Sequence, residues 1–412
     1  MSSPDLVDGD RLGVGSALRQ AGLPEDDIRS VIHVLEGPNL SMGPQIAAFE
    51  KYFCDYTGAR HAIGVNSGTA GLHLCVRAAG IQAGDLVLTT PFSFISSSNV
   101  ILFENAIPVF VDAEPRTGNI DIARLAEAAR DLSAGGEKAR QWLPRNLPSL
   151  PASPHPLRLK AILPVDVFGQ PPDMDAINQI ASEYGLAVIE DSCEALGSEY
   201  RGRKAGRLGD YGVYAFYPNK QITTGEGGVI VTDNDQAAGF MRALRNQGRA
   251  PGDTWLQHTY LGYNYRLDEM SAALGVTQMQ RIQELLAKRE QVAGWYGERL
   301  SETAGVEMYT VEPATTRMSW FVYVVKFARG IDRLAVAHGL EAYGIPVRPY
   351  FAPIHLQPFM VERFGYRLGD FPVTEDLGMR GLAIPFSSVM TEGMVEQVCR
   401  AIRAVIQALP KS

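Results

Sequence analysis

Short apolar runs, closed by glycine or polar residues, alternate with amphipathic stretches through the first half of the chain. Seven of these runs predict β-strands, at residues 62–66, 86–90, 108–111, 160–165, 186–190, 212–216 and 228–232. Most of them are apolar at consecutive positions rather than at alternate ones. This pattern indicates strands that are buried on both faces of a sheet.

Amphipathic stretches with helical spacing separate several of these strands, at residues 69–79, 93–104, 120–130 and 173–184. Strand–helix–strand connections favour a mainly parallel sheet with helices on both faces. The last two strands lie too close in sequence for a helical crossover. We therefore expect them either to pair antiparallel or to be separated by the loop between them.

The pattern changes after these strands. Residues 270–300 carry Leu, Ile, Val and Ala at intervals of three and four, which predicts one long helix leading into a second domain. A strand at 320–327, a helix at 333–343, a proline-rich loop at 346–358 and a helix at 392–408 follow. The predicted parts are an N-terminal helical segment (1–40), a large α/β domain (41–285) with a mainly parallel seven-stranded sheet, and a smaller C-terminal α+β domain (286–412).

One segment, residues 132–158, is dense in proline between a predicted helix and a predicted strand. Proline at this density favours an extended loop that packs poorly. We interpret the segment as a surface insertion rather than a functional lid, and its role stays open.

The composition is that of an ordinary globular protein, with 46% hydrophobic residues. Acidic residues outnumber basic ones and give a formal net charge of -8. The negative charge argues against nucleic acid as a partner, because proteins that bind phosphate backbones present a basic face. Four cysteines lie far apart without a CxxC motif, so no metal site is predicted. The sequence shows neither a secretory signal nor an apolar run of membrane-spanning length, and a cytoplasmic location is expected.

A lysine stands between an apolar strand and a glycine-dense turn, Lys220 in AFYPNKQITTGEGG. A lysine that loses solvent at a strand end shifts toward its neutral amine, the form that attacks an aldehyde to make a Schiff base. The alternative is a solvated loop lysine, which this segment alone does not exclude.

Two other strand ends carry complementary chemistry. In NSGTAGL a strand runs directly into a helix, where free N–H groups, Gly68 and the hydroxyl of Thr69 suit a phosphate. In VIEDSCEALGS the carboxylates of Glu190 and Asp191 follow a buried strand, and one of them should point inward. A phosphate site, an inward acid and an amine are together what pyridoxal phosphate requires.

The ordered blocks of this sequence strongly resemble the DegT/DnrJ/EryC1/StrS family of sugar aminotransferases, which are fold-type I pyridoxal phosphate enzymes. The resemblance covers residues 41–403. It rests on SMGPQIAAFEKYF, HAIGVNSGTAGLHL, GDLVLTTPFSFISS, IPVFVDAEPRTGNID, FGQPPDMDAI, EDSCEALGS, the lysine segment and LGYNYRLDEMSAALG.

The resemblance implies a role for each matching residue. Lys220 is expected to form the Schiff base with the cofactor and to move protons, and Asp191 to hold the pyridinium. Gly68 and Thr69 are expected to contact the phosphate, and Phe94 to lie against the ring face.

The resemblance also implies a homodimer whose active sites lie at the subunit interface. Asn264, in YNYR, is expected to reach the phosphate bound by the other subunit. Tyr350 and His355, in RPYFAPIHLQPF, are expected on the substrate side.

Two residues depart from the family pattern. Ala215 stands where many members have a serine that donates to the phosphate, so that hydrogen bond must come from elsewhere. Glu194 stands where glutamine commonly faces the cofactor's phenolic oxygen. A carboxylate would repel that oxygen, and we expect Glu194 to be protonated or turned away.

The resemblance implies an aminotransferase that moves an amino group from an amino acid, expected to be L-glutamate, to a nucleotide-linked ketosugar, with pyridoxamine phosphate as the intermediate cofactor form. A dehydratase that uses pyridoxamine phosphate is one alternative, but such enzymes carry histidine at the position of Lys220. A non-catalytic regulatory protein that binds pyridoxal phosphate is the other. The sugar, the nucleotide, the aminated carbon and the donor are left open.

Overall fold

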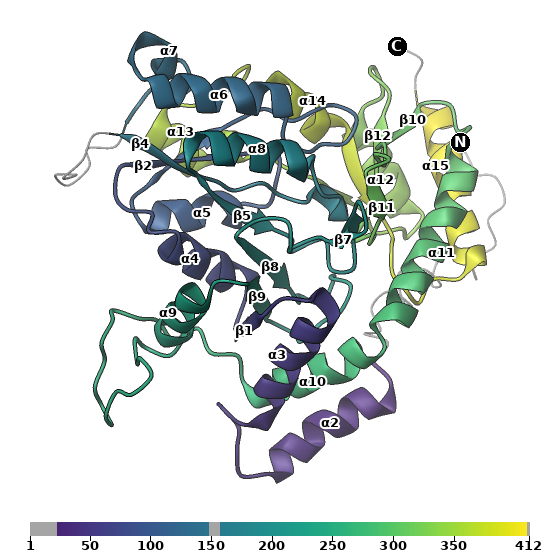
Figure 1. Cartoon of the computed structure of the whole chain (residues 1–412). Helices are drawn as coiled ribbons and strands as arrows, with labels where there is room; N and C mark the ends of the chain where they lie inside the picture. Colours follow the sequence, from purple (N-terminus) through teal and green to yellow (C-terminus); the bar gives the residue numbers. More distant parts are fainter. Residues whose placement is uncertain (1–22, 148–156, 410–412) are drawn as a thin grey trace.

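A seven-stranded β-sheet forms the centre of the larger part of the molecule (Figure 1). The computed structural model describes residues 23–147 and 157–409. The strands lie in the order β1-β9-β8-β5-β4-β2-β3. Their bounds are β1 His61–Val65, β2 Asp85–Thr89, β3 Ile107–Phe110, β4 Arg158–Ile162, β5 Ala187–Asp191, β8 Tyr211–Ala215 and β9 Gly228–Thr232. All seven predicted strands are confirmed.

The sheet is mainly parallel, as predicted. Strands β3, β2, β4, β5 and β8 pair parallel to one another, whereas β9 pairs antiparallel with both β8 and β1. In the β8–β9 pair Ala215 lies opposite Gly228. The segment that carries Lys220 is therefore the loop joining two paired antiparallel strands, at the edge where β5 and β8 end.

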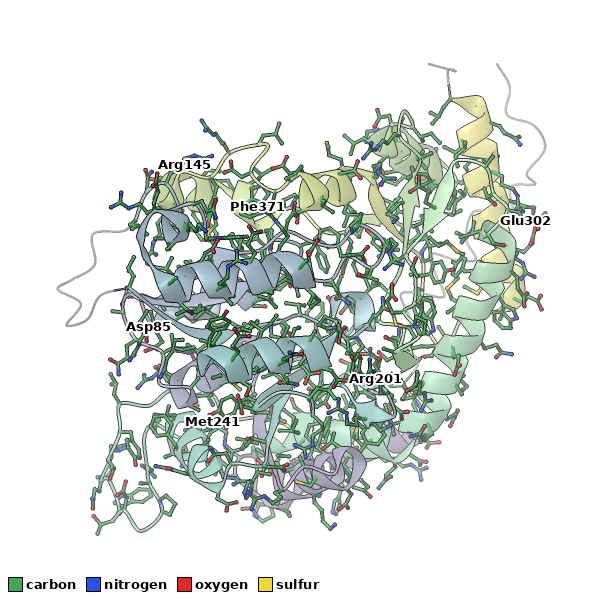
Figure 2. The ribbon with its side chains drawn as sticks, turned by 45° about the horizontal axis from the view of Figure 1, so that its top comes forward. Asp85, Arg145, Arg201, Met241, Glu302 and Phe371 are labelled. Atoms are coloured by element: carbon green, nitrogen blue, oxygen red, sulfur yellow. The ribbon has the colours of Figure 1, made fainter. Side chains whose placement is uncertain are left out.

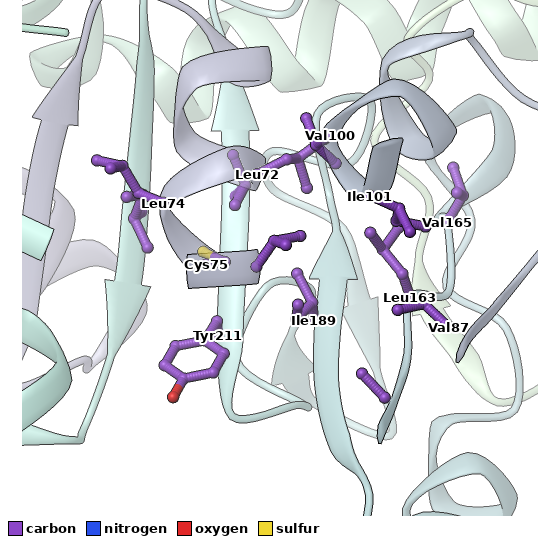
Figure 3. Packing of buried hydrophobic residues seen from close by; sticks show 14 of the residues in the cluster. Leu72, Leu74, Cys75, Val87, Val100, Ile101, Leu163, Val165, Ile189 and Tyr211 are labelled. Atoms are coloured by element: carbon purple, nitrogen blue, oxygen red, sulfur yellow. The ribbon is translucent and has the colours of Figure 1, made fainter. Parts of the chain in front are cut away.

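Alternate side chains of the strands enter cores on opposite faces of the sheet, as a strand with both faces covered requires. In β2, Val87 packs under the helices of one face, in the core shown in Figure 3. Leu86 and Leu88 pack under the helices of the other face. The first face is covered by α4 Gly68–Ala78, α5 Ser96–Phe103 and α9 Asp235–Arg245. The second is covered by α6 Ile122–Ala134 and α8 Met174–Tyr184. Met241 of α9 is among the side chains that fill the first core (Figure 2).

A further core lies beside the β1 edge of the sheet. It joins residues of β1, β8 and β9 to α3 Pro44–Thr57, α10 Glu269–Gln280 and the start of α11 Ile282–Leu300. Helix α2 Glu25–Glu36 lies outside α10 at the periphery (Figure 1). The predicted N-terminal segment is thus helical and peripheral where it is described, and residues 1–22 lie outside the described residues.

The C-terminal part contains a second, antiparallel sheet in the order β10-β12-β14-β13. Its strands are β10 Val306–Met308, β12 Tyr323–Phe327, β13 Arg348–Pro349 and β14 Gly381–Ile384. Its own core includes residues of α11, α12 Arg333–Ala342 and α15 Glu392–Ala408. This is the α+β mixture that the sequence predicts, although the domain boundary at residue 285 stays a prediction.

The single helix predicted over residues 270–300 is wrong. The structure has two helices, α10 and α11, separated at Arg281, whose φ of -110° and ψ of 13° are not helical. The guanidinium of Arg281 donates to both carboxylate oxygens of Asp27 on α2, at 2.8 Å each. The apolar spacing did not reveal the break because both helices keep their apolar faces buried, α10 against α3 and the later part of α11 in the C-terminal core.

Several short elements had no counterpart in the sequence pattern. They are the three-stranded sheet of β11 Thr315–Arg317, β6 Glu199–Tyr200 and β7 Arg203–Lys204, the helices α7 Gly136–Arg140, α13 Pro358–Phe364 and α14 Pro372–Arg380, and the 3-10 turns η2 Val167–Gly169 and η3 Ile354–Leu356. Elements this short bury too few residues to leave a periodic signal.

The first residues of the proline-rich segment are helical, in α6 and α7, and do not form the extended loop that was expected; its middle lies against the C-terminal part. Arg145, near Phe371 in Figure 2, forms an ion pair with Asp370 at 2.5 Å, and the N–H of Asn146 donates to the carbonyl of Phe364. Residues 148–156 lie outside the described residues, so the choice between insertion and lid stays a prediction. Within the described ranges no helix combines the length and apolar character needed to cross a membrane.

Candidate active site

A cavity of about 1000 Å³ opens where β5 and β8 end and α4 begins. It brings together residues from both parts of the molecule. Of the predicted site residues, those lining it are Gly68, Thr69, Phe94, Asp191, Glu194, Lys220 and Tyr350. Asn264 and His355 do not line it.

The N-terminus of α4 faces this cavity. Ser67 caps the helix by accepting a hydrogen bond from the N–H of Ala70 at 3.0 Å. A Cβ atom at Gly68 would lie 2.7 Å from the Cβ of Ala215 and 2.8 Å from the Sγ of Cys193, so only glycine fits this close approach. The first N–H groups of a helix have no partner within it and favour an anion there. These features suit a phosphate group.

Asp191 is the inward acid that the sequence predicts. It ends β5, is 4% exposed, and accepts hydrogen bonds from Ser97 Oγ at 2.8 Å and from the N–H of Cys193 at 3.2 Å. Ser97 is itself hydrogen bonded to Ser93 at 2.9 Å. No cation in the described part of the chain forms an ion pair with Asp191, so a cationic ligand group would complete its surroundings.

Glu190 points away from the cavity into the interior. Its carboxylate accepts hydrogen bonds from the N–H groups of Gly206, Leu208 and Gly209. Burial raises the pKa of Glu190 to about 7, against the lowering effect of these donors. Glu190 therefore stabilises the turn before β8 and does not contact a ligand in the cavity.

Lys220 and Glu194 face each other across the cavity wall, with Nζ and Oε1 3.8 Å apart and side chains 13% and 8% exposed. The other carboxylate oxygen of Glu194 accepts from the N–H of Phe168 at 2.9 Å. Burial raises the pKa of Glu194 to about 7, and the nearby ammonium of Lys220 opposes the rise. Nζ of Lys220 also lies 3.9 Å from the centre of the Phe321 ring.

The remaining predicted residues differ in their surroundings. Phe94 lines the cavity and is 63% exposed, so its ring is accessible to a bound group. Burial raises the pKa of Tyr350 to about 12, and its side chain is hydrogen bonded to Asn219. Asn264 is exposed, and its carbonyl accepts from Asn66 at 3.3 Å.

His355 is placed differently from the expectation that it faces the substrate. Its side chain is 0% exposed, and its Nε2 lies 2.9 Å from Oε1 of Glu375. Burial lowers the pKa of His355, although Glu375 opposes the effect. Its neighbours Ile354 and Gln357 line the cavity instead.

Several lining residues were missed by reasoning from the sequence. Ser93, Phe321 and Arg348 face the cavity, and Ser97 supports Asp191 from behind. Ser93, Ser97 and Arg348 lie in segments that the sequence singled out, Arg348 as the first residue of RPYFAPIHLQPF, whereas Phe321 does not. Phe321 and Arg348 come from the C-terminal part, and no local pattern shows that it folds back onto the sheet. No group of His, Cys, Asp and Glu within the described ranges could hold a metal ion.

Known proteins are similar to this chain in sequence and in fold. Residues 23–403 match the model of the DegT/DnrJ/EryC1/StrS aminotransferase family, whose members use pyridoxal phosphate. The chain is 37% identical over 368 residues to GDP-perosamine synthase of Caulobacter vibrioides, covering 89% of this chain and 91% of the relative. It is 32% identical over 396 residues to the spore coat polysaccharide biosynthesis protein SpsC of Bacillus subtilis, covering 93% and 95%.

Among solved structures, DesV of S. venezuelae in complex with a ketimine intermediate superimposes with a TM-score of 0.81 and 28% identity, covering 93% of this chain and 95% of that one. An aminotransferase of Brucella abortus superimposes with a TM-score of 0.81 and 26% identity, covering 96% and 97%. These structures confirm the predicted fold-type I architecture. The chain therefore belongs to the DegT/DnrJ/EryC1/StrS aminotransferase family.

Proposed function

We propose that this protein transfers an amino group from an amino acid, expected to be L-glutamate, to a nucleotide-linked ketosugar, expected to be an NDP-4-keto-6-deoxyhexose. One observation carries the proposal: a single cavity is lined by the amine of Lys220, the buried carboxylate of Asp191 and the N-terminus of α4. The name of the Caulobacter relative, GDP-perosamine synthase, supports a sugar linked to a nucleoside diphosphate.

The residues of the cavity fit pyridoxal phosphate. Gly68 and Thr69 would hold its phosphate at the start of α4, Asp191 its ring nitrogen, and Phe94 its ring face. When bound, this cofactor supplies an aldehyde that takes up the amino group and a ring that accepts the electron pair left at Cα.

Lys220 is the base that this chain places beside the cofactor. Its Nζ would move a proton from Cα of the amino donor to C4′ of the cofactor, and would move one in the opposite sense when the ketosugar is aminated. Glu194 lies 3.8 Å from that amine, so its carboxylate is an ion-pair partner for it. Tyr350 lines the same cavity.

Both proposed substrates are anions. Among the described residues that line the cavity, the cations are Lys220 and Arg348. Arg348 is exposed, and the one hydrogen bond found for its side chain goes to the neighbouring carbonyl of Val347. Its guanidinium is therefore available to an incoming carboxylate or diphosphate. A substrate contact by His355 stays a prediction.

We also propose that two copies of the chain form a homodimer with active sites at the interface. Asn264 is exposed and stands outside the cavity of its own chain, which supports a role in the site of the partner. Phe94, 63% exposed at the cavity, leaves one side of the site uncovered in the single chain.

A spectroscopic assay tests the proposal. Purified protein loaded with pyridoxal phosphate should absorb in the visible, and glutamate should bleach this absorption. Lys220→Ala should lose both behaviours. The glutamate-treated enzyme is then incubated with a panel of nucleotide ketosugars, and mass spectrometry identifies the sugar that gains an amine. Visible absorption that no amino acid bleaches would contradict the proposal.

A further inference from the structure

Arg289 is a buried arginine without an acidic partner. It lies on α11, is 5% exposed, and forms no ion pair within the described ranges. Burial lowers the pKa of Arg289 to about 10. An uncompensated buried cation is costly, so its contacts must offset a substantial penalty.

Its guanidinium joins two segments that are far apart in sequence. One nitrogen, Nη2, donates to the carbonyl of Lys220 at 2.7 Å. The other, Nη1, donates to the carbonyls of Trp320 at 3.2 Å and Phe321 at 3.1 Å. The planar fork of arginine can hold acceptors on two sides at once, which the ammonium of lysine cannot do in a fixed geometry.

The two segments meet again at the cavity. The ring of Phe321, 2% exposed, lies 3.9 Å from Nζ of Lys220. A second tie is made by Gln221, whose Nε2 donates to the carbonyl of Glu194 at 2.6 Å and to Oγ of Ser319 at 2.8 Å. Two contacts thus hold the segment of Lys220 against residues 319–321, one through Arg289 and one through the side chains of Gln221 and Ser319.

We propose that Arg289 is a positioning residue, which sets the place of the Lys220 amine by holding its backbone against the segment of Phe321. The inference rests on the proposed role of Lys220. Because Arg289 belongs to the helix that enters the C-terminal core, it also makes the position of the amine depend on how that part packs against the sheet.

The variants Arg289→Met and Arg289→Lys test this proposal, with Arg299→Met as a matched control. Arg299 is also on α11, but it bonds to Glu392 and Glu396 of α15 and does not line the cavity. Each substrate-free protein is mixed with pyridoxal phosphate. The rate at which visible absorption appears, the pH midpoint of that absorption and the thermal unfolding temperature are recorded.

Arg289→Met should slow the appearance of absorption about tenfold, as expected when a reactive group loses its fixed orientation. Its pH midpoint should move by about half a unit or more. Arg289→Lys should change the rate and the pH midpoint less than Arg289→Met does. Arg299→Met should lower only the unfolding temperature. A folded Arg289→Met with the wild-type rate and midpoint overturns the proposal, and if that variant does not fold, wild-type behaviour of Arg289→Lys does so. Failure of the wild type itself to develop absorption would instead contradict the proposed function.

Discussion

The amine of Lys220 lies 3.8 Å from a carboxylate oxygen of Glu194, and both side chains are almost fully buried. Where the amine is expected to react with an aldehyde, an acid of raised pKa is its nearest charged neighbour. A group of this kind changes protonation close to neutral pH and couples its own charge to that of the amine.

The first prediction concerns this acid in the cofactor-free protein. The pKa of Glu194 rises from 4.5 to about 7 on folding. The folded state thus binds more protons than the unfolded state between these values, and its free energy of unfolding falls as pH rises through this window. Glu194→Gln should reduce the fall by on the order of 1–3 kcal/mol. Chemical denaturation at about pH 5 and pH 7.5 measures it.

Glu190, whose pKa is raised to about 7 as well, is present in both proteins and cancels in the comparison. The cofactor-loaded proteins allow a second measurement. The visible absorption of the wild type and that of Glu194→Gln should change with pH at different midpoints. Superimposable titrations together with parallel stability profiles would rule out the role given to Glu194.

A second prediction concerns the missing phosphate donor. Ala215 lies at the end of β8 beside Gly68, where a hydroxyl could reach an anion at the start of α4. Ala215→Ser should lower the dissociation constant of pyridoxal phosphate about three- to tenfold, the worth of one added hydrogen bond. Equilibrium dialysis measures the constant, and Ala215→Gly serves as the control without a donor. Equal affinities in all three proteins would count against a phosphate at this position.

The third prediction concerns Asp191 and its support. Asp191→Asn removes the charge proposed to hold the cofactor's ring nitrogen, and single-turnover bleaching by glutamate should slow about a thousandfold or more. Ser97→Ala removes hydrogen bonds to Asp191 and Ser93 but leaves the charge of Asp191 in place, so the slowing should be about tenfold. Stopped-flow absorbance separates the two. Bleaching at the wild-type rate in Asp191→Asn would remove the acid from the proposed mechanism.

The fourth prediction tests the shared active site. Lys220→Ala and Asn264→Ala should each abolish or greatly weaken activity alone. When the two variants are refolded together in equal amounts, half of the dimers contain one subunit of each variant. Each of these mixed dimers has one site with both native residues. About a quarter of wild-type activity should therefore return. If the mixture stays as inactive as its components, Asn264 does not serve the partner's site.

Much of the fold follows from local signals. Continuous apolar strands such as 228–232 predicted their own burial. The short link carrying Lys220 excluded a helical crossover and left antiparallel pairing at β9 as one of two expected arrangements, the one that the structure has. Gly68 and Asp191 could be recognised because each follows a strand whose end faces the site.

The rest depends on contacts between distant segments. The sequence around Phe321 and around Arg289 contains no motif that indicates a function. Only folding brings the two side chains to Lys220. His355 shows the converse, since its sequence context suggested a substrate contact and its ring is enclosed with Glu375. The break at Arg281 escaped notice because both helices keep their apolar faces buried, so the apolar spacing continues across it.

The most direct test of the account is chemical. The protein loaded with pyridoxal phosphate is reduced with borohydride, digested, and mapped by mass spectrometry. The account predicts a single phosphopyridoxyl group on Lys220 in the wild type and none in Lys220→Ala. A group on another lysine, or an unlabelled protein, would contradict it.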